Sequence, residues 1–367
     1  MINHLYVHVP FCKSICYYCD FCHRIYDNQL VNKWLNALSK EIKDVCKDQF
    51  KTIYIGGGTP NSLSHEELDR LLSLINPYSS IVEEYTIEIN PESFNEKQIE
   101  LFKKYRINRF SIGLQSSNNN ILKTINRKHT YEDVLNVVTS LKKNGFNNIS
   151  IDLMYSLPNQ TIDDLNKTLD DVISLDVPHI SIYSLAIEES SVFGKNGITN
   201  LDEDTEADMY ELIINKLVSN GYEHYEVSNF CKKGYESKHN IGYWDYDDYL
   251  GISLSSTSKI KDHRYTTTRN FDSYFDSYKN RDEDLNLTLK DMIIENVMMS
   301  LRTNKGLSLI DFKIKYNIDF IDIFKNSLDK FKDDVIIKDN RAVCNNLAIL
   351  NNILIYFYID LDTYFNK

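Results

Sequence analysis

The chain has few glycines and prolines, 12 and 6 among 367 residues, and no stretch of it is low in complexity. It lacks any apolar run of about 18 residues, and residues 1–10 lack the charged and apolar regions of a signal peptide. Basic residues are a minority, since 41 Lys and Arg face 53 Asp and Glu for a net charge of −12. These absences predict a cytoplasmic protein without an integral membrane segment, and they argue against nucleic acid as a partner.

Cysteine is unevenly distributed along the sequence. Four of the seven cysteines lie close together, at Cys12, Cys16, Cys19 and Cys22. In a reducing compartment such a cluster indicates metal binding rather than disulfides. The three remaining cysteines are isolated, and we expect them to be inert thiols.

A short β-rich run, a turn and an amphipathic stretch alternate six times, which predicts a parallel, barrel-like (β/α)6 arrangement of the α/β class. The expected strands are 4–10, 51–55, 85–90, 109–114, 149–154 and 179–185. The expected helices are 32–46, 65–75, 95–105, 130–145, 161–175 and 204–221. The predicted helix ends are N-caps at Ser64, Asn95 and Thr161, and C′ glycines at Gly145 and Gly221.

Two of the expected strands carry polar residues on one face. Alternation places Thr86, Glu88 and Asn90 opposite two isoleucines, and it places Asp152 opposite apolar neighbours in the fifth strand. If the apolar face packs on the helices, Glu88 and Asp152 point into the lumen near the carboxyl ends of the strands, where barrel enzymes build their sites. Hydrogen-bonded structural groups are the alternative.

The cysteine loop follows the first expected strand, so its thiolates lie at the same mouth of the barrel. Cys12, Cys16 and Cys19 can hold three corners of an iron–sulfur cubane, because such clusters are typically bound by cysteine. One iron is then left open. An open iron can chelate S-adenosylmethionine and pass an electron into its sulfonium, which yields a 5′-deoxyadenosyl radical.

Ligation by all four cysteines, of zinc or of a closed cluster, is the competing interpretation. The next expected strand weakens it, because that strand ends in three glycines, Gly56, Gly57 and Gly58, followed by Thr59 and Pro60. Adjacent glycines allow the backbone to approach a ligand closely. A closed electron-transfer cluster needs no such loop.

The sequence resembles the HemN/HemW group of radical S-adenosylmethionine proteins over nearly its whole length. This resemblance makes the expected fold a radical S-adenosylmethionine partial (β/α)6 barrel with a small, mostly helical C-terminal domain. The matching stretches include YVHVPFCKSICYYCDF (6–21), YIGGGTP (54–60), EINPES (88–93), NRFSIGLQS (108–116), INRKH (125–129), DLMYSLPNQT (152–161) and GYESKHNIGYWDYDDYLG (234–251).

The resemblance also implies which residues contact the cofactors. Cys12, Cys16 and Cys19 hold a [4Fe–4S] cluster. The implied contacts with S-adenosylmethionine are Tyr6 and Tyr18 near the cluster, Gly57, Gly58, Thr59 and Glu88 near the methionine amino group, and Gln115, Arg127, Asp152 and Ala186 near the carboxylate, ribose and adenine.

Within this group the choice is between heme chaperones and oxygen-independent coproporphyrinogen III oxidases. The oxidases carry a long extension before the cysteine loop, and they have a further cysteine where this chain has Phe21. The chaperones have an HNxxYW pattern associated with heme binding, which here implies heme contacts by His239, Tyr243 and Trp244. The resemblance therefore favours a heme chaperone.

One stretch departs from the group. Where relatives have a glycine-rich segment ending in Gly-Ala-His-Ser, this chain has serines at 253, 255 and 256 and Thr257 in place of the histidine. Added Cβ atoms are costly where a backbone must approach a ligand. We expect an altered tetrapyrrole side of the site and a complete cluster side.

The resulting prediction is a barrel (1–225), a bridging segment with the HNxxYW motif (226–285) and a C-terminal domain (286–367) that ends in short strands such as ILIYFYI. The expected function is to bind heme and transfer it to an acceptor protein. The alternatives are an oxidative decarboxylase of coproporphyrinogen III and another radical enzyme acting on tetrapyrroles, so whether the chain is an enzyme stays open. Expected partners are heme, a heme acceptor, an electron donor such as a flavodoxin or ferredoxin, and a second copy of the chain.

Overall fold

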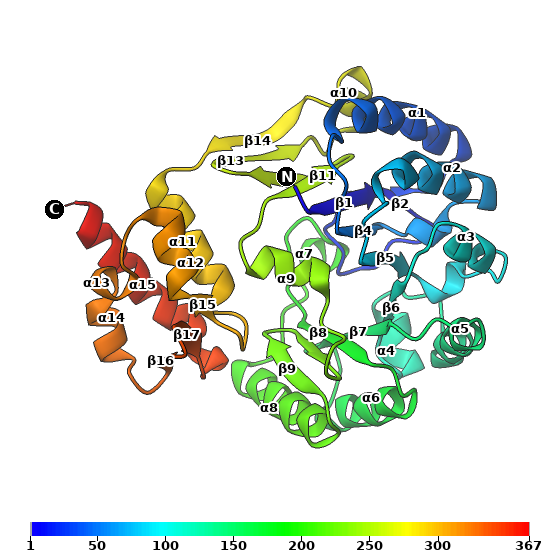
Figure 1. The fold of residues 1–367 in the computed structure, drawn as a ribbon. Coiled ribbons are helices and arrows are strands. Elements are labelled where there is room, and N and C mark those ends of the chain that lie inside the picture. Colours follow the sequence, from blue (N-terminus) through cyan, green and yellow to red (C-terminus); the bar gives the residue numbers. More distant parts are fainter. Residues whose placement is uncertain (1, 367) are drawn as a thin grey trace.

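The computed structural model describes residues 2–366 and contains six parallel strands that curve into an open barrel (Figure 1). The strands are β1 (His4–Val9), β4 (Thr52–Gly57), β5 (Glu84–Ile89), β6 (Arg109–Gln115), β7 (Ile149–Tyr155) and β8 (His179–Ser184). They are neighbours in the sheet in this order, and each pair is parallel. The predicted α/β partial barrel is confirmed.

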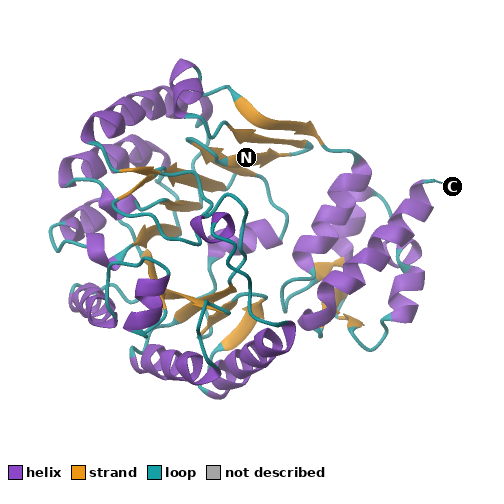
Figure 2. Ribbon diagram, turned by 180° about the vertical axis from the view of Figure 1, so that it is seen from behind, coloured by secondary structure: helices purple, strands orange, loops and turns teal. Residues whose placement is uncertain are grey.

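Helices cover the outside of the barrel (Figure 2). The long ones are α1 (Asn28–Val45), α2 (His65–Ile75), α3 (Gln98–Lys104), α5 (Tyr131–Lys143), α6 (Ile162–Ser174) and α8 (Glu203–Ser219). Two short helices, α4 (Asn119–Thr124) and α7 (Val192–Lys195), lie in loops after β6 and β8. Because every strand returns through an outer helix, the carboxyl ends of all six strands meet at one mouth.

Most of the predicted helix ends are present. The side chains of Ser64 and Thr161 accept hydrogen bonds from backbone N–H groups three residues later, in capping boxes. Gly145 and Gly221 follow their helices with φ of 88° and 83°, the left-handed conformation expected of a C′ glycine.

The predicted N-cap at Asn95 is wrong. Helix α3 begins at Gln98, and the residue before it is Lys97. The Asn95 side chain instead accepts a hydrogen bond from the Lys97 backbone N–H at 3.0 Å. A short polar side chain that bonds two residues ahead forms a turn rather than a helix start, so the helix begins later than its pattern indicated.

Strands at the end of the predicted barrel region and in the predicted bridging segment continue the barrel sheet at both ends. Strands β11 to β14 extend it beyond β1, and β9 and β10 extend it beyond β8, giving a sheet of 12 strands. The elements are β9 (Glu223–Glu226), β10 (Asn229–Cys231), α9 (Lys238–Trp244), β11 (Tyr249–Ile252), β12 (Thr257–Ile260), β13 (His263–Thr267), α10 (Phe271–Asp276) and β14 (Arg281–Asn286). Helix α9 lies inside the arc of strands (Figure 1).

A second apolar core belongs to the C-terminal region, beside the open side of the barrel (Figure 1). Its elements are α11 (Leu289–Ser300), β15 (Leu307–Ser308), α12 (Leu309–Tyr316), α13 (Phe320–Ile323), α14 (Lys325–Lys330), β16 (Val335–Lys338), β17 (Arg341–Cys344) and α15 (Leu350–Phe365). The expected small, mostly helical domain is therefore present.

The expectation that ILIYFYI forms a strand is wrong, because residues 353–359 lie in helix α15. The run is almost wholly apolar, so it has no period that separates a strand from a helix. In the structure, Ile353, Phe357 and Leu361 recur every four residues on the buried face. Packing on α11 and α14 selects the helix.

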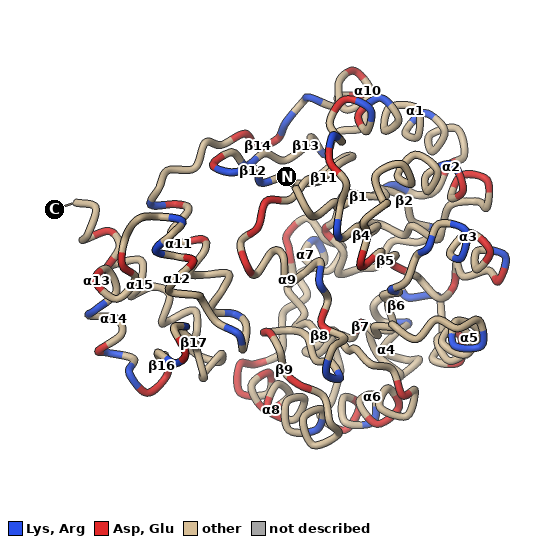
Figure 3. The backbone as a smooth tube through the Cα atoms, viewed as in Figure 1, with Lys and Arg blue, Asp and Glu red and all other residues tan. Residues whose placement is uncertain are grey.

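The distribution of charged residues and the hydropathy of the helices can be compared with what the composition predicts. Lys and Arg are interspersed with Asp and Glu along the outer helices (Figure 3). No helix within residues 2–366 is both long enough and apolar enough to cross a membrane.

The serine-rich stretch retains a backbone suited to glycine. Ser253 and Ser255 have φ of 81° and 58°, which L-residues rarely adopt. Ser253 is fully buried, where its hydroxyl accepts from Trp34 Nε1 at 2.8 Å and its N–H donates to Glu41 at 3.0 Å. Serine at 253 is therefore tied into the packing of α1, whereas Ser255 keeps the strain without these contacts.

Ser255→Gly should raise the free energy of unfolding by about 0.5 kcal/mol, because the relief of a left-handed serine exceeds the backbone entropy that glycine costs. Ser256→Gly is the matched control. Its hydroxyl donates to the Ser253 carbonyl at 2.6 Å, so its loss should lower stability. Thermal unfolding of the three proteins measures both effects, and a lower stability in Ser255→Gly would contradict the strain assignment.

Candidate functional site

A cavity of about 390 Å³ opens at the carboxyl ends of the barrel strands. It gathers residues from the cysteine loop, from the glycine turn after β4 and from the lumen faces of β5 to β8. Of the predicted cofactor residues, those that line it are Cys12, Cys16, Tyr18, Cys19, Gly57, Gly58, Thr59, Glu88, Gln115, Arg127, Asp152 and Ala186. Tyr6, His239, Tyr243 and Trp244 do not line it.

Two short parallel strands hold the ends of the cysteine loop together. These are β2 (Phe11–Cys12) and β3 (Arg24–Ile25). Within the loop, the Tyr17 N–H donates to the Ile125 carbonyl at 3.1 Å, and the Tyr17 carbonyl accepts from the Phe193 N–H at 2.9 Å. The loop is therefore fastened to the segments after β6 and β8 as well as to β1.

The three cavity thiols meet different neighbours. Thr59 Oγ1 lies 3.4 Å from Cys12 Sγ, and Arg127 Nη1 lies 3.6 Å from Cys16 Sγ. Burial raises the pKa of Cys12 to about 12 and that of Cys19 to about 11. Both thiols hold their protons at neutral pH, so a metal that binds them must displace protons.

Cys22 is separate from the other three cysteines of the loop. It is 8 % exposed, belongs to the main apolar core and does not line the cavity. Its Sγ donates to the Arg269 carbonyl at 3.5 Å, in the bridging segment. The geometry therefore supports ligation by three cysteines and gives Cys22 a packing role.

The zinc interpretation gains no support from the described residues. Among residues 2–366, no three His, Cys, Asp or Glu side chains converge closely enough to hold a single metal ion. A cubane accepts thiolates that are further apart, because each one binds a different iron.

The glycine turn leaves room beside the cysteine loop. Gly57 has φ of 112°, and a Cβ at Gly58 would lie 2.7 Å from the Phe11 carbonyl and 3.0 Å from Cys12 Sγ. A side chain here would collide with the loop, so glycine is required for this close approach. The residues present therefore fit a cluster at the three thiols with a ligand beside it.

Glu88 is the carboxylate nearest the glycine turn. It accepts from Tyr54 Oη at 2.9 Å and from the Gly57 N–H at 3.1 Å. Burial raises its pKa to about 7 despite these two hydrogen bonds. A group that titrates near neutral pH in a cavity is suited to receive a cation.

Asp152 lies on the neighbouring part of the lumen. Ser111 Oγ lies 2.9 Å from both of its carboxylate oxygens, and Ser150 Oγ lies 3.2 Å from one of them. Burial raises the pKa of Asp152, and the hydrogen bond from Ser111 opposes this. The polar strand faces predicted from alternation thus do meet in the lumen.

Arg127 is held by the protein at one end of its guanidinium. Its Nη2 donates to the Gly113 carbonyl at 2.7 Å and to Asn90 Oδ1 at 3.0 Å. Its Nε is buried without a hydrogen-bond partner among the described residues. The arginine is therefore positioned beside Cys16, with one donor left to satisfy.

Tyr6 lies behind the cavity rather than in its wall. Its Oη is 3.0 Å from His8 Nδ1, and His8 Nε2 is 2.8 Å from the Cys22 carbonyl. Tyr6 thus supports the cysteine loop through His8. His8 was not among the predicted site residues, although its place two residues after Tyr6 puts both on the same face of β1.

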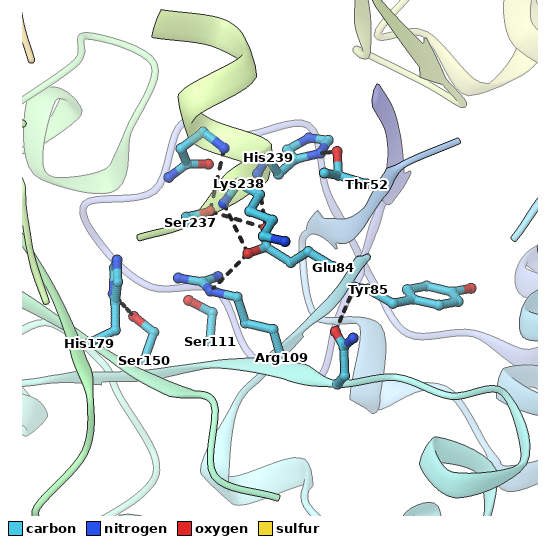
Figure 4. Close-up of polar contacts among 12 residues, drawn as sticks. Thr52, Glu84, Tyr85, Arg109, Ser111, Ser150, His179, Ser237, Lys238 and His239 are labelled. Atoms are coloured by element: carbon cyan, nitrogen blue, oxygen red, sulfur yellow. Dashed lines mark hydrogen bonds and ion pairs between the residues drawn. The ribbon is translucent and has the colours of Figure 1, made fainter. Parts of the chain in front are cut away.

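His239 of the HNxxYW motif lies beside Thr52 and Glu84, the first residues of β4 and β5 (Figure 4), whereas Asn240 of the same motif lines the cavity. His239 is 1 % exposed, with Nδ1 2.7 Å from Thr52 Oγ1 and Nε2 2.9 Å from Tyr243 Oη. The Trp244 carbonyl accepts from Ser300 on α11 at 3.3 Å. In this arrangement both ring nitrogens of His239 are used within the protein, and its role as a heme contact stays a prediction.

Glu84 and Arg109 complete this floor, and neither was predicted. Glu84 accepts from the N–H groups of Lys238 and His239, each at 2.9 Å, and Arg109 Nε lies 4.0 Å from its carboxylate (Figure 4). Both side chains are buried. The sequence did contain a signal for them, because each is a charged residue at the first position of an otherwise buried strand, β5 or β6.

Comparisons with known proteins place this geometry in a family. Residues 6–172 match the Radical SAM superfamily. The heme chaperone HemW of Lactococcus lactis subsp. lactis (strain IL1403) is 37% identical and covers 92% of this chain and 92% of its own length, and that of Bacillus subtilis (strain 168) is 35% identical over 92% and 93%. The solved structure of coproporphyrinogen III oxidase (HemN) from Escherichia coli has a TM-score of 0.84 at 22% identity and covers 99% of this chain and 90% of that one, which shows a shared fold.

Replacing Cys12, Cys16 or Cys19 with Ser should each abolish the cluster, because each thiol lines the cavity. Cys22→Ser should retain it, since Cys22 packs in the core. Iron and sulfide content and the absorption in the blue after anaerobic reconstitution measure the difference. Equal loss in Cys22→Ser would favour ligation by four cysteines.

Glu88→Gln and Asp152→Asn should leave the cluster in place and weaken S-adenosylmethionine binding by about 1.5 to 3 kcal/mol each, the usual cost of losing a charged hydrogen bond. Calorimetric titration of the reconstituted proteins measures it. Unchanged affinity in both variants would mean that the polar lumen is structural.

The raised pKa of Glu88 adds a pH dependence to this binding. The positively charged amino group of S-adenosylmethionine needs the ionised carboxylate of Glu88, so the affinity for S-adenosylmethionine should rise as the pH increases from 6 to 8. Binding at pH 7 should release on the order of half a proton. Titrations in buffers of different ionisation enthalpy measure the release. Wild-type protein without release, or release that persists in Glu88→Gln, would contradict the assignment.

Proposed function

The chain belongs to the HemW family of radical S-adenosylmethionine proteins, and from this we propose that it binds heme and transfers it to an acceptor protein. Identity of 37% over nearly the full length of a heme chaperone carries the proposal. The proposal extends to a cytoplasmic location, an electron donor such as a flavodoxin or ferredoxin, and a homodimer.

A [4Fe–4S] cluster with S-adenosylmethionine supplies one-electron chemistry at the mouth of the barrel. Cys12, Cys16 and Cys19 would hold the cluster, and the turn of Gly57, Gly58 and Thr59 would hold the methionine amino group. Glu88 would accept that cation as it loses its proton. Arg127 would place its free Nε–H toward the carboxylate, and Gln115, Asp152 and Ala186 would line the ribose and adenine.

The volume of the cavity at the barrel mouth is consistent with S-adenosylmethionine as its ligand. A volume of 390 Å³ is near the lower end of the range of roughly 300 to 1,000 Å³ for pockets of drug-sized molecules. This volume suits a ligand of the size of S-adenosylmethionine.

The oxidase remains the second candidate because of its shared fold. Oxidative decarboxylation of coproporphyrinogen III requires that its propionates reach the reactive end of S-adenosylmethionine. In this chain Phe21 stands at the position where the oxidases have a further cysteine. Its large side chain is 63 % exposed at the mouth, which favours contact with a flat ring there.

Reconstituted wild-type protein should bind heme at micromolar concentration and should leave coproporphyrinogen III unchanged under anaerobic conditions with an electron donor and S-adenosylmethionine. The heme spectrum measures the first result, and chromatography of oxidised porphyrins measures the second. The Cys12→Ser variant is the control for cluster dependence. Formation of protoporphyrinogen IX, or failure to bind heme with an intact cluster, would reject the chaperone proposal.

A further inference from the structure

A chain of polar side chains runs behind the cavity and ends at Asp152. His179 Nε2 lies 2.9 Å from Tyr225 Oη, and His179 Nδ1 lies 2.8 Å from Ser150 Oγ (Figure 4). Ser150 Oγ in turn lies 3.2 Å from Asp152 Oδ1. Tyr225, His179 and Ser150 are all buried, and none of them lines the cavity. The chain therefore reaches the cavity only through Asp152.

A backbone N–H group fixes the direction of the hydrogen bond at Tyr225. The Ser237 N–H donates to Tyr225 Oη at 3.3 Å, so the phenolic oxygen is an acceptor at this contact. Among the described residues, the phenolic proton has one acceptor within hydrogen-bond distance, which is His179 Nε2. A buried hydroxyl that lacks an acceptor is costly, so Tyr225 donates to His179.

This donation determines the tautomer of His179. Burial and the positive charge of Arg109 lower the pKa of His179 well below its usual value, so the ring is neutral at pH 7. A neutral imidazole carries one proton, and Nε2 is already an acceptor. The proton is therefore on Nδ1, and the Nδ1–H group donates to Ser150 Oγ.

The tautomer of His179 leaves the hydroxyl proton of Ser150 free for another acceptor. Asp152 Oδ1 and Ser181 Oγ both lie 3.2 Å from Ser150 Oγ. The carboxylate is the stronger acceptor, so Ser150 donates to Asp152 and adds to the donation from Ser111 Oγ at 2.9 Å. With the opposite tautomer, His179 would accept this proton and Asp152 would lose one of its donors.

We propose that Tyr225, His179 and Ser150 are positioning residues for S-adenosylmethionine, because they keep Asp152 ionised and oriented toward the cavity. The proposal rests on the proposed binding of S-adenosylmethionine and adds residues that do not touch this cofactor. Each bond in such a chain polarises the next one, so a change at His179 or Tyr225 reaches the carboxylate through Ser150. None of the three is among the predicted cofactor residues.

The test is a calorimetric titration of full-length, cluster-loaded protein with S-adenosylmethionine, with iron content and thermal unfolding measured for every variant. Ser150→Ala should weaken binding by about fivefold, because Asp152 loses a donor. His179→Leu and Tyr225→Phe should each weaken it by about threefold, since the donor stays but its orientation is lost. His179→Asn should bind nearly as well as wild type, because its amide N–H can replace Nδ1–H.

His224→Leu is the matched control for His179→Leu. His224 lies on β9, its Nε2 is 3.2 Å from the Val227 carbonyl, and it does not line the cavity. Its loss should leave the affinity for S-adenosylmethionine unchanged.

A double variant separates positioning from a merely structural role. In the Ser150→Ala background, His179→Leu should cause no further loss of affinity, because the chain is already interrupted. Nitrogen NMR of the wild-type holoprotein with labelled histidine should show His179 protonated at Nδ1. An equal loss in both backgrounds, protonation at Nε2, or wild-type affinity in Ser150→Ala would overturn the proposal.

The same titrations distinguish this proposal from the cofactor site on which it rests. If wild-type protein with an intact cluster binds no S-adenosylmethionine, the proposed cofactor site fails, and the positioning role fails with it. If wild-type protein binds it and Asp152→Asn weakens binding, while the Ser150 and His179 variants bind as wild type does, only the positioning role fails.

Discussion

Burying ionisable side chains inside a parallel barrel has a large desolvation cost, and the rest of the structure depends on how that cost is met. At the floor it is met by α9. The first N–H groups of this helix donate to the Glu84 carboxylate, and Arg109 supplies a nearby positive charge. The HNxxYW sequence thereby closes one end of the lumen, with His239 bonded to Thr52 on the adjacent strand.

At the mouth the same cost is not met by the protein alone. Burial raises the pKa of Glu88 to about 7 and that of Cys12 to about 12, and Arg127 Nε is buried without a partner among the described residues. Groups in this condition are stabilised by a ligand that brings metal and opposite charge. The floor is only partly satisfied as well, because Arg109 Nε and Trp244 Nε1 are also buried without hydrogen-bond partners among the described residues.

Local features of the sequence were sufficient for much of this site. Strand alternation predicted that Glu88 and Asp152 share a lumen, and the spacing of Cys12, Cys16 and Cys19 predicted three thiols at its mouth. Both follow from geometry within a few residues. Prediction failed where local pattern was ambiguous, as in ILIYFYI, or where a turn outcompeted a helix start, as at Asn95.

The sequence by itself determined the parallel α/β barrel, the polar strand faces and the cysteine loop, because each depends on the period or spacing of nearby residues. Only the tertiary structure decided which partners the ring nitrogens of His239 have. His239 belongs to a recognisable motif, yet its nitrogens are taken by Thr52, 187 positions away along the chain, and by Tyr243. Such contacts join segments that are distant along the chain, so no local pattern of the sequence encodes them.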